Sequence, residues 1–98
     1  MEVIFRNKPH TVKKEKYAET KNICLVLTEK DTNQRAAVAT INMADRVNLQ
    51  PDEVIIKDYS ENQGMLKALI DGKIIAIPDR QFVLNQFGTL AYISKCLI

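Results

Sequence analysis

The chain has few of the side chains that bind metal ions or activate nucleophiles: its 98 residues include one histidine and two cysteines. The histidine is His10, and no Cys-x-x-Cys pair occurs. A zinc site needs a set of such ligands, and a catalytic serine needs a base beside it. We therefore predict no metal site, no cofactor and no enzymatic activity.

The two cysteines, Cys24 and Cys96, each lie in an apolar, strand-like run. A buried free cysteine packs as a small apolar side chain. We predict two reduced thiols. A disulfide between neighbouring strands is one alternative, and metal or redox chemistry is another.

Long apolar runs and glycine-rich loops are also absent from the sequence. A membrane helix needs about 20 mostly apolar residues, and no run approaches that length. The segment from Met1 to Lys8 carries Glu2 and Arg6, unlike the apolar centre of a secretory signal. The three glycines stand apart, at positions 64, 72 and 88, so they form no phosphate-binding loop. We expect a cytoplasmic protein that does not contact a membrane.

The composition is that of a folded globular domain, with 46 % apolar and 27 % charged residues. A length of 98 residues fits a single domain with a modest core, spanning residues 1–98. The net charge of +2 is too small to indicate nucleic-acid binding by itself.

Residues 1–21 predict a hairpin or an arm ahead of the core that residues 22–98 form. Glu2 to Phe5 is a short apolar run that ends before Pro9. Thr11 to Tyr17 alternate without a convincing apolar face, and their lysines are typical of an exposed edge strand.

The next segments predict β structure. Ile23 to Thr28 is apolar on both faces, which is typical of a central, covered strand. A polar turn separates it from Ala36 to Met43, and the two segments predict an antiparallel hairpin. Val54 to Lys57 predicts a further strand.

One helix is predicted from Glu61 to Asp71. Ser60 is a favourable N-cap, and Gln63 follows it at the spacing of a capping box. Gly72 follows the last apolar turn as a stop signal. Gly64 inside the helix would cost about 1 kcal/mol relative to alanine, which indicates a close approach or a functional reason. The apolar face comprises Met65, Leu66, Leu69 and Ile70.

A second hairpin is predicted from Gln81 to Phe87 and from Leu90 to Leu97. Its buried faces are predicted to contain Phe82, Leu84, Leu90 and Tyr92. Together the patterns predict an α+β fold, with a mainly antiparallel sheet of about five or six strands and one amphipathic helix packed on one face. The helix is expected to lie against Ile23–Thr28 and Val54–Lys57.

Three segments carry a family resemblance: Asn22–Leu27, Ala37–Asn42 and above all Ile56–Leu66, which reads Ile-Lys-Asp-Tyr-Ser-Glu-Asn-Gln-Gly-Met-Leu. They resemble, in order and spacing, a family of small domains of unknown function encoded on bacterial plasmids, phages and integrative elements. The resemblance covers residues 22–98, including an arginine-containing turn at Pro78-Asp79-Arg80. It implies an accessory protein of a mobile element, in the bacterial cytoplasm, that binds a host or competitor protein.

The corner between the predicted strand and helix is the densest polar segment. There Asp58, Tyr59, Glu61 and Asn62 combine an aromatic ring with polar and acidic groups, and tyrosine is frequent at interface hot spots. We predict that these residues bind a protein partner. In one alternative the Tyr59 ring packs over the helix start. In another, Asp58, Ser60 and Glu61 act as catalytic groups, which would require a deep apolar pocket.

A second candidate function is nucleic-acid binding by Lys13, Lys14 and Lys16 of the basic N-terminal strand, which would contact phosphates. The alternative is that these lysines only solvate an exposed face. A homodimer could form through an edge strand, at Thr11–Tyr17 or at Leu90–Leu97.

Overall fold

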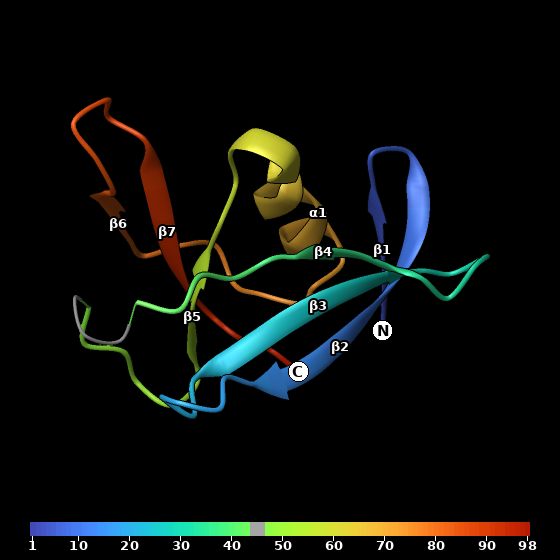
Figure 1. The fold of residues 1–98 in the computed structure, drawn as a ribbon, viewed down its shortest axis with the longest axis horizontal. Helices are drawn as coiled ribbons and strands as arrows, with labels where there is room; N and C mark the ends of the chain where they lie inside the picture. Colours follow the sequence, from blue (N-terminus) through green and yellow to red (C-terminus); the bar gives the residue numbers. More distant parts are fainter. Residues whose placement is uncertain (44–46) are drawn as a thin grey trace.

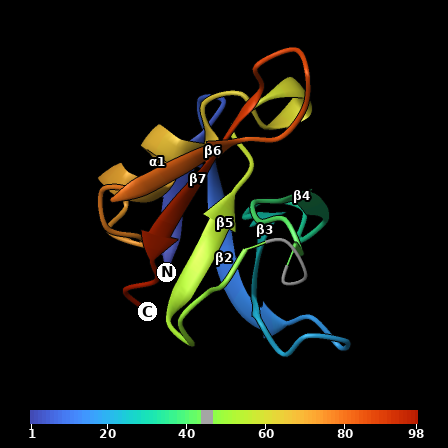
Figure 2. The same ribbon diagram turned by 90° about the vertical axis from the view of Figure 1, so that its left-hand side faces the viewer.

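The structure is a computed structural model that describes residues 1–43 and 47–98. Two antiparallel sheets and one short helix make up this part of the chain (Figures 1 and 2). The first sheet has the order β1-β2-β3-β4, with bounds Glu2–Phe5, Lys8–Lys16, Ile23–Glu29 and Arg35–Val38. The second has the order β5-β7-β6, with bounds Glu53–Ile56, Leu90–Lys95 and Arg80–Val83. The helix α1 spans Met65–Asp71, after a 3-10 turn, η1, at Ser60–Asn62.

The predicted α+β class and the antiparallel pairing are confirmed. The described chain has a four-stranded and a three-stranded sheet, however, instead of one sheet of about five or six strands. The difference arises because the alternation of apolar residues indicates strands but not the sheet to which each strand belongs.

The N-terminal segment is an integral part of the first sheet. The prediction of an exposed hairpin partner or edge strand at Thr11–Tyr17 is confirmed in part. β1 pairs with Lys8–Thr11 of β2, whereas β3 pairs with His10–Lys16, so within the described residues Lys13–Lys16 have a neighbouring strand on one side only. Phe5 and Val12 are both buried in the core. Arg6 and Asn7 close the β1–β2 hairpin with φ values of 53° and 64°, the left-handed backbone that two-residue hairpin turns favour.

The prediction of a central strand is confirmed, since Ile23–Thr28 of β3 is buried throughout and β3 pairs with both β2 and β4. The strand predicted at Ala36–Met43 is divided between the two sheets. Its pairing with β3 ends in β4 at Val38, and Thr40 then pairs with Ile56 of β5. The chain crosses from the first sheet to the second at this point. The single alternating pattern of Ala36–Met43 therefore contains residues that pair with β3 and a residue that pairs with β5.

The helix begins at Met65 instead of Glu61. Ser60 has a φ of 58° and starts η1, and its side chain caps neither helix. Gly64 lies just before α1 with a φ of 92°, so it occupies a left-handed position that favours glycine and does not weaken a helix interior. The predicted end at Asp71 is confirmed.

The core has two parts that meet at β5. The larger part lies between the sheets and α1, and it contains Val54 and Ile56 of β5. The smaller part contains Ile55, whose side chain points to the opposite face of the strand. The predicted helix packing is confirmed and extends to β1, since the larger part also holds Val3, Phe5, Leu25, Leu27, Met65 and Leu69.

The C-terminal hairpin is confirmed, but its fully buried positions on β7 differ from those predicted. Ala91 and Ile93 are buried, whereas Leu90 and Tyr92 are only partly covered. Ala91 pairs with Phe82 of β6, so these two residues share one face of the sheet. The prediction is confirmed in part, since Phe82 and Leu84 pack against the smaller part of the core and Tyr92 packs against the larger part. Both faces of the hairpin carry apolar residues, so alternation alone did not identify the fully buried positions.

Both thiols are free, as predicted. Cys24 is buried in β3 and Cys96 is half-buried after β7.

Candidate functional site

Two of the predicted partner-binding residues hold the corner together. Asn62 is 1 % exposed, and its Nδ2 donates a hydrogen bond of 2.7 Å to the carbonyl of Val38, which ties η1 to β4. The Leu66 amide donates to Oδ1 of Asp58 at 2.8 Å. Asp58 thus satisfies an amide in the first turn of α1, the role that the sequence predicted for Ser60. Asn62 offers no exposed surface to a partner.

The other two predicted residues, Tyr59 and Glu61, lie at the surface on either side of Lys57. Lys57 forms an ion pair with Glu61, and its Nζ lies 5.3 Å from the centroid of the Tyr59 ring. The hydrogen bond from Lys57 is the main reason that the pKa of Glu61 is lowered to about 2. Glu61 is therefore an anion at neutral pH, and Tyr59 packs against a cation.

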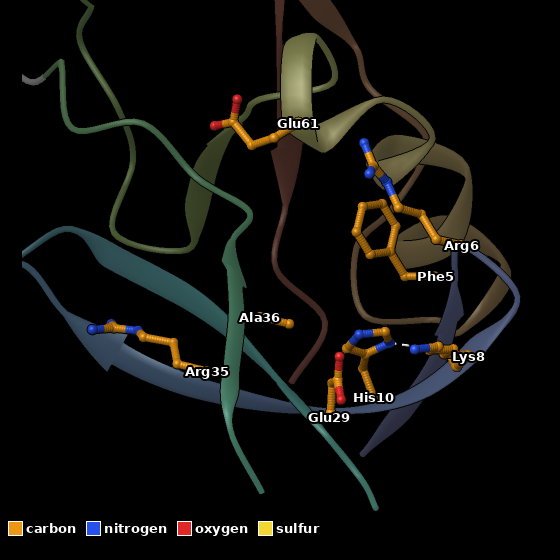
Figure 3. Close-up of a pocket in the computed structure, with 8 residues that line it drawn as sticks. All are labelled: Phe5, Arg6, Lys8, His10, Glu29, Arg35, Ala36 and Glu61. Atoms are coloured by element: carbon orange, nitrogen blue, oxygen red, sulfur yellow. Dashed lines mark hydrogen bonds between the residues drawn. The ribbon is translucent and has the colours of Figure 1, made fainter. Parts of the chain in front are cut away.

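Glu61 also lines a hollow of about 450 Å³ (Figure 3). We call this site the hollow. Its walls come from η1, from the turn between β1 and β2, and from the ends of β3 and β4 that face them. The lining residues are Phe5, Arg6, Lys8, His10, Glu29, Arg35, Ala36 and Glu61.

The floor of the hollow is aromatic. Phe5 is 5 % and His10 is 4 % exposed, and their rings meet edge to face with centroids 5.7 Å apart. The His10 Nδ1 lies 2.9 Å from the carbonyl oxygen of Lys8 and donates its proton there, since a carbonyl can only accept. The guanidinium of Arg6 lies 5.5 Å from the centroid of the Phe5 ring. Phe5 therefore helps to hold Arg6 at the rim.

Positive charge is in slight excess on the wall, where Arg6, Lys8 and Arg35 lie with the two acids Glu29 and Glu61. Glu61 pairs with Lys57, and Oε2 of Glu29 accepts a hydrogen bond of 3.2 Å from the Thr32 hydroxyl. Arg6 and Lys8 form no ion pair with any residue in the described ranges 1–43 and 47–98. These two cations are available to an anionic group.

A third cation, Arg35, stands on the opposite wall. Its guanidinium lies 4.0 Å from a carboxylate oxygen of Glu15, and both side chains are more than half exposed. Such exposed pairs contribute at most about 1 kcal/mol. Arg35 can therefore turn to a ligand at little cost.

The three lysines predicted to bind nucleic acid do not line the hollow, and they do not all lie on one face of the sheet. Lys13 lies opposite Val26 and Lys14 lies opposite Leu25, so their side chains point to different faces of the sheet. Lys16 shares a face with Lys14, whose Nζ donates a hydrogen bond of 2.7 Å to the carbonyl of Ile98. β2 therefore does not present these lysines as one row for a phosphate backbone.

In the alternative prediction Asp58, Ser60 and Glu61 act together as catalytic groups. Of these three residues Glu61 lines the hollow, whereas Asp58 and Ser60 do not. Within the described residues, no cluster of three or more His, Cys, Asp or Glu is placed to hold a metal ion. None of the helices in the described ranges has the length and apolar character to cross a membrane.

Comparisons of the chain with models of protein families, with curated proteins and with solved structures find no match. The family resemblance of residues 22–98 therefore stays a prediction. The geometry of the corner and the hollow is what bears on function.

The sequence indicated Glu61 as a site residue but not Arg6, Arg35 or Glu29. A local signal existed for two of them, because Glu29 and Arg35 flank the turn of the predicted β3–β4 hairpin. Nothing local indicates that this turn faces Arg6, because that proximity depends on the order of strands in the sheet.

Proposed function

We propose that this chain is a non-enzymatic binding protein that takes an acidic segment of a partner protein into the hollow. The observation that carries the proposal is the pair of cations, Arg6 and Lys8, without ionic partners among the described residues, at the rim of an aromatic floor. Arginine binds carboxylates through two parallel hydrogen bonds, which suits an acidic side chain of a peptide.

The corner would form the neighbouring rim of the same contact surface. Tyr59 and Glu61 are its accessible side chains, and Asp58 and Asn62 hold them in place through their bonds to Leu66 and Val38. Tyrosine and arginine are both enriched where protein interfaces are strongest. The family resemblance adds that the partner would be a host or competitor protein met by a bacterial mobile element.

A protein partner is favoured over nucleic acid because of the mixed charge of the hollow. Glu29 and Glu61 lie beside the cations and would repel a continuous phosphate backbone, whereas a peptide can present one or two carboxylates to Arg6 and Lys8. The net charge of +2 also gives little general attraction to nucleic acid.

The test is affinity capture from bacterial lysate, with and without nuclease. The test variant is Arg6→Glu/Lys8→Glu, and the matched control is Lys13→Glu/Lys16→Glu, which makes the same change in charge outside the hollow. We expect a partner that survives nuclease, binds the wild type and the control, and is lost from the test variant. Equal capture by the test variant would refute the hollow as the site. Material removed by nuclease and lost from the control variant would instead favour nucleic-acid binding by β2.

A titration of the isotopically labelled protein tests the chemistry of the ligand directly. We expect poly-glutamate to shift the backbone NMR signals of Arg6, Lys8 and Arg35, and poly-lysine of equal length to leave them unchanged. Shifts caused by both polymers, or confined to Lys13 and Lys16, would contradict an anion site in the hollow.

A further inference from the structure

The strand β6 is an open edge of the second sheet. Among residues 1–43 and 47–98 it pairs with β7 alone, and it lies at one end of the molecule (Figure 1). The other edge of this sheet is closed, because Thr40 pairs with Ile56 of β5 and the Ile41 amide donates to the carbonyl of Ile55 at 3.0 Å.

The backbone amides and carbonyls of β6 point alternately toward β7 and toward the open edge. The Leu84 amide donates to the carbonyl of Thr89 at 2.7 Å, just beyond the β6–β7 pairing. Opposed residues of antiparallel strands alternate between bonded and non-bonded pairs. Phe82 therefore bonds to β7, whereas Gln81 and Val83 direct their amides and carbonyls to the open edge.

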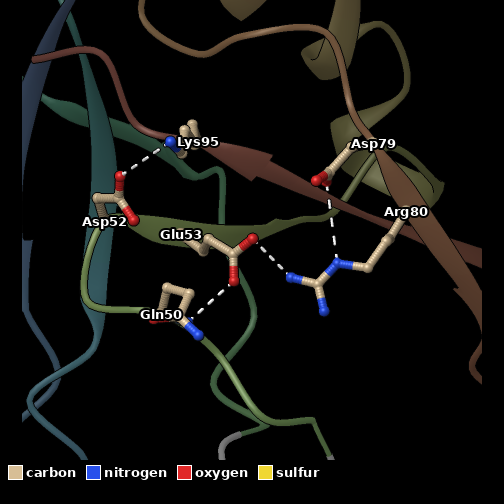
Figure 4. Close-up of polar contacts among 6 residues, drawn as sticks. All are labelled: Gln50, Asp52, Glu53, Asp79, Arg80 and Lys95. Atoms are coloured by element: carbon tan, nitrogen blue, oxygen red, sulfur yellow. Dashed lines mark hydrogen bonds and ion pairs between the residues drawn. The ribbon is translucent and has the colours of Figure 1, made fainter.

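The edge lacks the charges by which proteins usually protect such strands. The sequence from Gln81 to Ser94 contains no acidic, basic or histidine side chain. The charged residue of β6, Arg80, donates to the Glu53 carboxylate at 2.5 Å and lies 3.9 Å from Asp79 (Figure 4). Two apolar side chains of the hairpin are exposed, Val83 at 54 % and Phe87 at 82 %.

The outer strands of the first sheet differ from β6. β1 carries Glu2 and packs beside α1, and β4 carries Arg35 and has its Val38 carbonyl bonded to Asn62. In a symmetric antiparallel pair each strand meets its own copy, so the central residues must suit one another. The helix beside β1 and the bond from Asn62 to β4 restrict those two edges, whereas β6 has an uncharged centre with no such neighbour among the described contacts.

We infer that β6 pairs antiparallel with β6 of a second copy of this chain, in a two-fold symmetric dimer with one continuous sheet. The register centred on Phe82 places Gln81 opposite Val83 of the second copy and uses every outward amide and carbonyl of both residues. It also places the two Phe82 rings side by side, a favourable cross-strand pair. The β1–β2 turn lies at the opposite end of the molecule, so the dimer leaves the hollow open (Figure 1).

Sedimentation equilibrium of the full chain over a range of concentrations tests the inference. Pairing of such short strands buries less than the roughly 1,200 Å² of standard interfaces, so we expect a wild-type dimer that dissociates on dilution. Gln81→Lys/Val83→Lys places lysine opposite lysine and should be monomeric. Gln81→Lys/Val83→Glu places opposite charges across the same register and should restore the dimer. Ile4→Lys, at an exposed position on the β1 edge, should dimerise like the wild type.

Each outcome decides the inference. A wild-type chain that stays monomeric at about 1 mM would overturn it, as would a dimer that persists in Gln81→Lys/Val83→Lys. If both charged variants are monomeric, the edge is supported and the register centred on Phe82 is wrong. Thermal melts at concentrations where the wild type is monomeric should match the wild type, because the substituted side chains of β6 are exposed.

Discussion

Gly72 is the residue at which α1 comes closest to β1. A Cβ added there would lie 2.5 Å from Cγ1 of Val3 and 3.3 Å from the carbonyl oxygen of Glu2. Its φ of −81° is open to any residue, so the requirement for glycine is one of space. At Gly64 the requirement for glycine comes from the backbone conformation and not from space. Its φ is 92°, and no atom lies within 4 Å of an added Cβ.

We expect Gly72→Ala to lower the free energy of unfolding by about 1–3 kcal/mol, because the new methyl group overpacks the contact with Val3. Urea denaturation measures the loss. Val3→Ala should remove most of it, so that the double variant is clearly less destabilised than the sum of the two single variants. Additive effects would show that crowding against Val3 is not the cause.

Asp58 is the second residue whose role becomes visible only in the fold. We expect Asp58→Ala to lower the free energy of unfolding by about 1 kcal/mol, because the Leu66 amide at the start of α1 loses its acceptor. Asp58→Asn keeps an acceptor oxygen and should lose much less. Ser60→Ala serves as the control and should match the wild type in the same urea titration. An equal loss in Ser60→Ala and Asp58→Ala would contradict the assignment of Asp58 as the cap.

At the scale of elements, one ion pair joins the two outer strands of the second sheet, β5 and β6. Glu53 of β5 is 6 % exposed and accepts hydrogen bonds from Arg80 of β6 at 2.5 Å and from the Gln50 amide at 2.9 Å (Figure 4). The hydrogen bond from Arg80 is the main reason that the pKa of Glu53 is lowered, and the bond from the Gln50 amide lowers it further. β7 lies between the two strands, so the pair joins elements that do not bond to each other directly.

This pair should make stability depend on acid pH. The pKa of Glu53 is lower in the folded chain than the usual unfolded value of about 4.3, so its contribution is complete above that value. The contribution is lost as the pH falls from about 4.3 through the folded pKa. We expect the unfolding free energy of Glu53→Gln to fall less steeply over this range than that of the wild type. Glu19→Gln, at an exposed position, is the control, and parallel curves for Glu53→Gln and wild type would contradict the assignment.

At the scale of the whole molecule, α1 and both sheets depend on one shared core. Leu69 is fully buried in the larger part of that core, which contains side chains of β1, β3 and β5. The helix has seven residues and would not be stable alone, so it exists because this face is buried.

We expect Leu69→Ala to cost about 2–5 kcal/mol and Leu69→Asp to unfold the whole chain, because an unpaired charge would be placed in the core. Circular dichroism during heating measures both. Lys67→Ala, at an exposed position of the same helix, should melt close to the wild type. A Leu69→Asp protein that is soluble and melts cooperatively would refute the packing of α1.

The failures of sequence-based prediction have identifiable causes. Val12 is followed by Lys13, Lys14 and Lys16, which is typical of an edge strand, yet the first half of β2, Lys8–Thr11, pairs with β1 on the side away from β3. Ser60 and Gln63 have the spacing of a capping box, but the backbone at Ser60 turns to a φ of 58° and the helix starts later. In both cases the local pattern was present, and the observed backbone departs from the structure that the pattern favours.

Local residue patterns were sufficient to predict the α+β class, the central strand β3, the β3–β4 and β6–β7 hairpins, the end of α1 and the polar corner that contains Glu61. These features depend on alternation and turn chemistry, which act between residues close along the chain. The folded structure was needed to show that Arg6 and Lys8 face Glu61 across the hollow, because these residues lie far apart in sequence and no local pattern encodes their proximity. The β1–β2 pairing and the bond from Leu66 to Asp58 join residues close along the chain, but the local patterns there favoured an arm or edge strand and a cap at Ser60.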